Sequence, residues 1–214
     1  MTYLELVNDV LARLREPSVT SVTQTAYSTL IGKYINDIKR QVEDAWNWDC
    51  NETVLTVTTA AGTSTYTVTG SRRRHKDVTV NDATNRARLN NVPFKFIQNM
   101  QQLSTVQNGP PVYYAWNGWD GTDSKVELYP TPDGTYTIYF NMIVPQDDLS
   151  AASDVLLIPS EPVILGAYAR AIVERGEDGG LNSSEAYALY KSSLSDHIAL
   201  ESTRQTENDC WVAV

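Results

Sequence analysis

The hydrophobic pattern of the chain changes its period twice, and this constrains the fold more than any other feature. From residue 2 to about residue 46, apolar residues recur every three or four positions, as in helices that bury one face. From about 53 to 144 they alternate in short runs between turn-forming residues, as in strands. After Pro159 the helical period returns. The sequence therefore predicts an α+β fold in the order helix, strand, helix.

Two helices are expected before residue 50. Thr2 and Glu5 match a capping box, and the apolar stripe that follows ends at Glu16-Pro17, because the residue before a proline disfavours helix. A longer helix is expected over about 23–46. Two tryptophans at its end are expected to pack the helices against the strands, Trp46 and Trp48. Two amphipathic helices joined by a short loop indicate an antiparallel hairpin.

The central region predicts short strands. Residues 53–59 are expected to pair with a return strand over 64–69, across a turn that contains Gly62. A short helix is one interpretation of 92–103. Further strands are expected over 77–80, 112–116, 125–129 and 135–144. Short strands between strong turn signals favour an antiparallel β-sandwich or barrel-like domain.

Two more helices are expected after Pro159. Ser160 is the expected N-cap of the first, and Gly176 its stop. The buried stripe of the last helix is expected to consist of Tyr187, Tyr190, Leu194, His197 and Ile198. Neither terminal hairpin can bury its stripe alone, so we expect both to join one helical bundle with the β domain inserted between them. The expected domains are 1–50 and 155–214 for the bundle with a C-terminal tail, and 51–154 for the insertion.

Charge and composition exclude several classes of protein. The formal net charge is −9, and residues 155–214 contribute four basic and nine acidic side chains, a net charge of −5. A chain this acidic lacks the broad basic surface that holds phosphate backbones or anionic lipid. No apolar run approaches a membrane span, and carboxylates interrupt the N-terminal stripe, so we expect neither a membrane segment nor a signal peptide. Cys50 and Cys210 are expected to be thiols.

No group of residues predicts catalysis, a metal or a cofactor. His75 lies in a basic run that disfavours a protonated imidazole, and His197 lies on a helical stripe. The spacings typical of zinc, calcium and phosphate-binding loops are absent. Asp120 and Asp123, beside Trp116 and Trp119, leave a hydrolase as a minor alternative, although Asp before Gly usually makes turns. We therefore expect a protein that is not an enzyme.

Two surface candidates remain in the β region. The run Arg72-Arg73-Arg74-His75-Lys76 could bind phosphate or an acidic partner, or could be a solvated hairpin tip. The second candidate is an aromatic group that could stack on sugars or bases, but that more often fills a core or a subunit interface; its members are Tyr113, Tyr114, Trp116, Trp119 and Tyr129.

The layout resembles the head-to-tail adaptor (connector) proteins of tailed bacteriophages, especially the tail tubular protein A or gatekeeper group. The resemblance spans nearly the whole chain. It rests on the opening helix with its Glu16-Pro17 end, on the long helix that closes at Ala45-Trp46-Asn47-Trp48, and on two later motifs. These are Val126-Glu127-Leu128-Tyr129-Pro130-Thr131-Pro132-Asp133-Gly134 with the strand after it, and Leu157-Ile158-Pro159 leading into Val163-Ile164-Leu165-Gly166-Ala167-Tyr168-Ala169.

The resemblance implies a structural virion protein at the head-to-tail junction, assembled in the host cytoplasm. It implies a ring, usually of twelve copies, that binds the portal protein on one side and the tail tube or nozzle on the other. DNA would pass through the lumen without sequence-specific binding, and an acidic wall would repel its phosphates. The family has no catalytic residues. Its C-terminal segment often reaches toward the portal, which here would make Trp211 and Val212 an apolar anchor.

Two alternatives stay open on the sequence alone. The aromatic β region is compatible with a glycan-binding module. A head-completion or tail-terminator protein of a long-tailed phage would share the structural class and differ in its neighbours.

Overall fold

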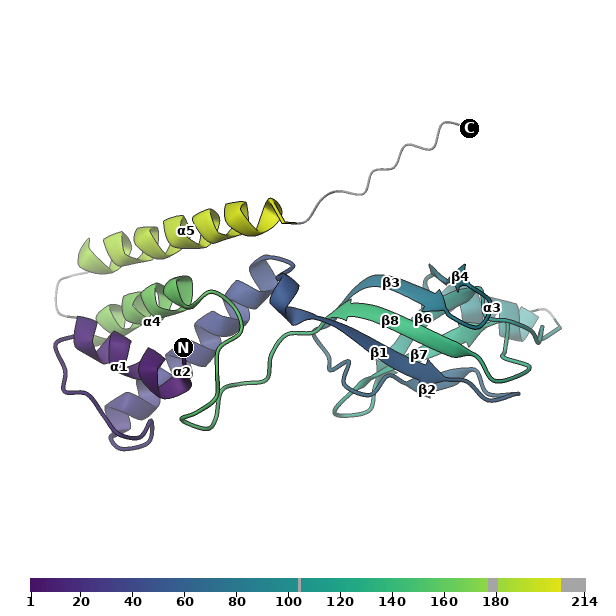
Figure 1. The fold of residues 1–214 in the computed structure, drawn as a ribbon, viewed down its shortest axis with the longest axis horizontal. Helices are drawn as coiled ribbons and strands as arrows, with labels where there is room; N and C mark the ends of the chain where they lie inside the picture. Colours follow the sequence, from purple (N-terminus) through teal and green to yellow (C-terminus); the bar gives the residue numbers. More distant parts are fainter. Residues whose placement is uncertain (104, 177–180, 205–214) are drawn as a thin grey trace. The chain divides into compact units, whose positions relative to one another are not determined.

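The computed structural model describes residues 1–103, 105–176 and 181–204. The chain forms two compact units, which Figure 1 shows as a group of helices and a group of strands. One unit holds residues 1–50 together with the described residues from 146 onward, and the other holds residues 51–145. Residues 146–154, which the sequence grouped with the strands, lie in the helical unit.

The helical unit draws its core from both ends of the chain. Its helices are α1 (Tyr3–Arg13), α2 (Ala26–Ala45), α4 (Ser160–Arg175) and α5 (Leu181–Ser202). The predicted capping box is present, because the Glu5 amide donates to Thr2 Oγ1 at 3.3 Å and the Thr2 amide donates to Glu5 Oε2 at 2.8 Å. One buried cluster contains Leu6 and Ile35 from the N-terminal part and Ala167 from the C-terminal part. Trp48 also belongs to this helical core.

Two local predictions for α4 and α5 need correction. Ser160 is the first residue of α4 and not its N-cap, which is Pro159. Tyr187 is 53% exposed, whereas Tyr190 and Leu194 of the same predicted stripe are buried. The predicted stop is confirmed, because Gly176 has a φ of +64° and its amide donates to the Ile172 carbonyl at 3.1 Å.

The second unit contains two four-stranded sheets in the order β1-β8-β3-β4 and β2-β7-β6-β5. Neighbouring strands are antiparallel except β5 and β6. The predicted helix within 92–103 is present as α3 (Phe94–Leu103), which packs on β6 and β7 through Ile97, Ala115 and Tyr129. The strands are β1 (Glu52–Thr58), β2 (Thr65–Thr67), β3 (Lys76–Asp82), β4 (Ala87–Arg88), β5 (Asn90–Asn91), β6 (Tyr113–Trp119), β7 (Ser124–Tyr129) and β8 (Thr137–Ile143).

The predicted hairpin between residues 53–59 and 64–69 is wrong. β1 pairs with β8, with Glu52 opposite Ile143, and β2 pairs with β7, with Tyr66 opposite Val126. The turn between β1 and β2 therefore carries the chain from one sheet to the other. Side chains from both sheets share one buried cluster, which makes the arrangement sandwich-like and confirms the predicted α+β class; it includes Val57, Phe140, Val126 and Leu128.

Gly166 allows α4 to pack closely inside the helical unit. A Cβ at this position would lie 2.7 Å from Ile38 Cγ2 of α2 and 3.1 Å from Tyr190 Cδ2 of α5. We expect Gly166→Ala to lower the free energy of unfolding by about 1–3 kcal/mol, although alanine favours helix, because the overlap forces neighbouring helices apart. Urea unfolding followed by far-UV circular dichroism measures this. Gly109→Ala is the control, since nothing lies within 4 Å of its Cβ; equal effects of the two changes would contradict the prediction.

Candidate partner-binding surfaces

The predicted basic run lies in the loop between β2 and β3 and ends at Lys76, the first residue of β3, and neighbouring loops hold it in place. Asp123 Oδ1 accepts the backbone amides of Gly70 at 3.0 Å and Arg72 at 3.1 Å. The Ser124 hydroxyl donates to the Arg72 carbonyl at 2.7 Å, and the Ser124 amide donates to Ser71 Oγ at 2.9 Å. Arg72 has a φ of +54°, a conformation unfavourable to a residue with a Cβ, which these contacts support. These hydrogen bonds therefore fix the conformation of the loop against the rest of the sandwich.

The side chains of the loop differ in what they offer to a partner. The Arg72 guanidinium donates to the Pro145 carbonyl of the same unit, which turns it inward. Arg73 and Lys76 are exposed, and Arg74 is half-buried. The Arg73 guanidinium lies 5.3 Å from the ring centroid of Trp119, which is 46% exposed. A cation stacked on an exposed indole is the most accessible feature of this loop.

His75 faces an acidic neighbour, which the sequence argument overlooked. Its Nε2 lies 3.8 Å from Asp77 Oδ1, its Nδ1 lies 3.1 Å from the Arg72 carbonyl, and its ring centroid lies 4.2 Å from that of Trp116. The imidazole therefore has an acidic side chain beside it, in addition to the basic residues of the run. The signal was available, because Asp77 lies two residues further along the chain.

The aromatic group is mostly internal. Tyr114 and Tyr129 are buried, and Asp77 Oδ2 accepts hydrogen bonds from Trp116 Nε1 at 2.7 Å and from the Tyr114 hydroxyl at 3.1 Å. Burial, with a smaller contribution from the charge of Asp77, raises the pKa of Tyr114 to about 12. Trp119 alone of the five is exposed. The group therefore supports the sandwich core, and no aromatic platform for a sugar is present among these five residues.

Asp120 and Asp123 organise a turn. Asp120 Oδ1 accepts the backbone amides of Asp123 at 2.8 Å and Thr122 at 2.9 Å, and these hydrogen bonds lower the pKa of Asp120. Asp123 holds the basic loop instead of facing Asp120. Neither carboxylate has the environment of a general acid, so the hydrolase alternative gains no support. Among the described residues, no group of three or more His, Cys, Asp or Glu is placed to hold a metal ion.

Asp123 is the residue on which the basic loop depends. Because Asp123 is buried, Asp123→Ala leaves the amides of Gly70 and Arg72 without their acceptor. We expect the free energy of unfolding of the β unit to fall by about 1–3 kcal/mol. We also expect faster amide exchange in peptides that cover residues 68–76, which reports the same loss locally. The control is Asp133→Ala at an exposed carboxylate; unchanged exchange at 68–76 in Asp123→Ala would contradict the assignment.

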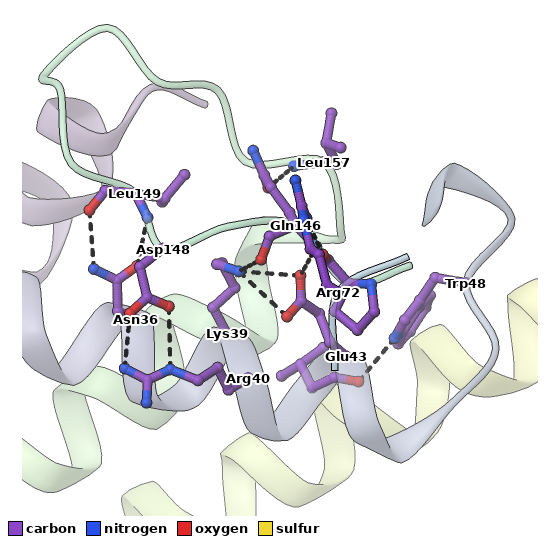
Figure 2. A network of polar contacts seen from close by, with 12 residues as sticks. Asn36, Lys39, Arg40, Glu43, Trp48, Arg72, Gln146, Asp148, Leu149 and Leu157 are labelled. Carbon is purple, nitrogen blue, oxygen red and sulfur yellow. Dashed lines mark hydrogen bonds and ion pairs between the residues drawn. The ribbon is translucent and has the colours of Figure 1, made fainter. Parts of the chain in front are cut away.

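The helical unit contains a polar network that sequence reasoning missed (Figure 2). Lys39 and Glu43 of α2 form an ion pair at 3.1 Å, and both side chains are 0% exposed. The Lys39 ammonium also donates to the Gln146 carbonyl at 2.6 Å, and Glu43 Oε1 accepts the Gln146 amide at 2.9 Å. The pair thus binds both the amide and the carbonyl of Gln146, the residue at which the chain returns to the helical unit.

The same face of α2 holds the residues that follow Gln146. The Asn36 amide donates to the Leu149 carbonyl at 3.0 Å and accepts the Leu149 amide at 2.8 Å. Arg40 binds Asp148 through two nitrogens, each at 3.1 Å (Figure 2). We call residues 146–158 the strap. The strap follows α2 because main-chain groups at Gln146 and Leu149 are bound by side chains of that helix.

Gln146 also shapes the far end of the strap. Its side-chain amide donates to the Val155 carbonyl at 2.7 Å and accepts the Leu157 amide at 3.2 Å. Leu156 and Ile158 point into the helical core, whereas Val155 and Leu157 are each 52% exposed. We call Val155 and Leu157 the ridge.

A cleft of about 720 Å³ lies between α2, α4 and α5. Gly166 and Ile38 contribute to its lining, with Tyr34 on α2 and Tyr187 on α5. Val173 of α4 also lines it and is 66% exposed. Apolar side chains at the surface of a cleft mark an interaction site more often than isolated exposed apolar residues do. We call this cleft the groove.

Two predicted residues, Trp211 and Val212, lie outside the described residues. Within the described part of the chain, no helix combines the length and the apolar character needed to cross a membrane.

A family model described as SU10 adaptor protein matches residues 1–209. No curated protein matches the chain in sequence. The family match covers nearly the whole chain, both units included, so the chain belongs to the SU10 adaptor protein family and is a structural protein of the bacteriophage head-to-tail junction.

Proposed function

We propose that this protein forms a ring between the portal and the tail tube or nozzle, through which DNA passes. The observation that carries the proposal is the family match over residues 1–209. A helical core built from both ends of the chain supports it, because such a core gives each copy one stable body from which the sandwich can contact neighbours. We infer a ring of about twelve copies by resemblance to other head-to-tail adaptors.

We assign the partner contacts to two segments. The exposed pair of Arg73 and Trp119 is suited to an acidic surface with an apolar component, such as a portal or tail protein. The C-terminal residues Trp211 and Val212 are suited to an apolar pocket of the portal. DNA is not a specific ligand in this proposal, since the net charge of −9 opposes tight binding of phosphates.

The proposal is tested with the full chain and the purified portal of the same phage. We expect the chain alone to sediment as a monomer or weak oligomer, and to form rings visible by electron microscopy when the portal is added. A chain that neither binds the portal nor forms rings would contradict the proposal.

The partner assignments are tested with variants in the same assay. We expect Arg73→Glu to weaken binding of the portal or of the nozzle, whereas Lys95→Glu makes the same charge change at an exposed position of α3 and serves as control. We expect removal of residues 205–214 to weaken portal binding. If Arg73→Glu and the chain without residues 205–214 both bound the portal and the nozzle as the unmodified chain does, the assigned contacts would be wrong. The adaptor role would still stand.

A further inference from the structure

We propose that the ridge of one copy inserts into the groove of the next copy, and that this contact repeats around the ring. The inference rests on the proposed ring, and it identifies the surfaces through which copies meet. Both surfaces belong to the helical unit, so each copy carries one of each. Val155 and Leu157 supply the inserting side chains, and Val173 and Tyr187 are the exposed apolar residues of the groove.

The strap, which carries the ridge, is bound to the side of α2 opposite the groove. Successive helical residues are turned by about 100°. Tyr34, Ile38 and Gln41 line the groove and share one face. Asn36, Lys39 and Glu43 hold the strap and share the opposite face, a half turn away. A surface and its complement on opposite sides of one body make a head-to-tail contact, which closes into a ring when the rotation per copy permits it.

The strap is held firmly enough to present the ridge. Gln146 fixes the backbone at Val155 and Leu157, and the buried Lys39–Glu43 pair fixes Gln146. Further along, Leu156 donates its amide to the Met1 carbonyl at 3.0 Å. A preorganised apolar pair loses little conformational freedom on binding, which favours association.

Charge complements the apolar fit. The strap contains three carboxylates and no basic residue: Asp147, Asp148 and Asp154. Backbone hydrogen bonds from Ser150 and Ala151 lower the pKa of Asp154, so it stays ionised at neutral pH. On the groove side, the Lys191 ammonium lies 5.5 Å from the ring centroid of Tyr187 and 5.4 Å from that of Tyr190. Glu174 also lines the groove and has the same charge as the strap carboxylates. The charges therefore favour the orientation that brings Asp154 toward Lys191 and away from Glu174.

The chemistry of the groove favours a second copy over a small molecule. Its volume lies within the range of ligand sites, but such sites direct a few polar groups at the ligand. Here Arg170 is engaged by Asp37 at 3.0 Å. Polar residues also contribute to the lining (Gln41, Glu174, Ser183 and Ser184), but Tyr34, Val173 and Tyr187 make the surface mainly apolar. An aliphatic pair flanked by carboxylates is suited to this lining.

The contact is tested by cysteine cross-linking of the full chain with Cys50 and Cys210 replaced by serine. One population carries Leu157→Cys and a second carries Val173→Cys. We expect a short bifunctional reagent to give dimers when the two are mixed on the portal, and few dimers within either population. Leu157–Leu157 dimers, or cross-links from Val173→Cys to the portal alone, would overturn the head-to-tail contact.

Assembly supplies the second measurement. We expect Leu157→Asp to weaken association between copies about tenfold or more, with unchanged helical content, because it places a charge in an apolar contact. We expect Lys191→Glu to weaken it less. The control is Leu200→Asp, since Leu200 of α5 is 64% exposed, against 52% for Leu157, and does not line the groove. Rings that form normally with Leu157→Asp would overturn this inference and leave the proposed function intact, whereas failure of the unmodified chain to form rings would overturn both.

Discussion

Replacing Lys39 with methionine is expected to lower the free energy of unfolding of the helical unit by about 3–5 kcal/mol. The substitution removes the ammonium that pairs with the fully buried Glu43 carboxylate at 3.1 Å and that donates to the Gln146 carbonyl. Because the Glu43 side chain is 0% exposed, water does not replace the lost cation there. The cost therefore arises mainly from a buried charge that has lost its ion-pair partner, more than from the loss of a favourable pair as such.

A double variant separates these two causes. In Lys39→Met with Glu43→Leu no buried charge remains, and apolar side chains of similar size fill the space, so we expect most of the lost stability to return. Recovery should be incomplete, because the amide and carbonyl of Gln146 still lack partners. Urea unfolding followed by circular dichroism at 222 nm measures all three proteins.

The exposed ion pair between Arg40 of α2 and Asp148 of the strap provides the control. Arg40 and Asp148 are 44% and 54% exposed, so Arg40→Met should cost no more than about 1 kcal/mol. An effect of Lys39→Met as small as that of Arg40→Met would mean that water reaches Glu43. The Lys39–Glu43 pair also holds Gln146, which positions the ridge. We therefore expect Lys39→Met to weaken association between copies more than its loss of helical content would predict.

Local signals in the sequence predicted the parts of the fold that local interactions determine. The pairing of Thr2 with Glu5 and the stop at Gly176 need only residues a few positions apart, and both are present. The change of period after Asp49 identified the strands for the same reason. The pairing of β1 with β8 depends on residues far apart, and alternation within a strand does not identify its neighbour.

The surfaces were harder to predict than the elements. Asn36, Lys39 and Glu43 are polar residues at helical spacing, a pattern typical of a solvated face, yet a distant segment covers them. Tyr187 follows the apolar period of α5 but is half exposed at the groove. In both cases burial depends on which segment packs against the helix. The basic loop was visible as a charge cluster, whereas its anchoring by Asp123, some fifty residues later, was not.

Replacing Phe140 with alanine is expected to destabilise the β unit by about 3–5 kcal/mol, because the side chain is fully buried at the centre of the sandwich. Its ring packs against Tyr114 and Trp116, with centroids 6.2 Å and 5.9 Å away. Substitution removes these contacts and leaves a cavity between the two sheets. Amide exchange followed by mass spectrometry measures the loss, since peptides from β8 and β3 should exchange faster.

The same experiment tests whether the units unfold separately. The two buried clusters share no residue, so loss of packing at Phe140 should not propagate to α4, whose peptides we expect to exchange as before. Leu6→Ala is the reciprocal change, because Leu6 is fully buried in the helical core and should accelerate exchange in α4 while sparing β8. If either variant accelerated exchange in both units equally, the two cores would unfold as one cooperative body.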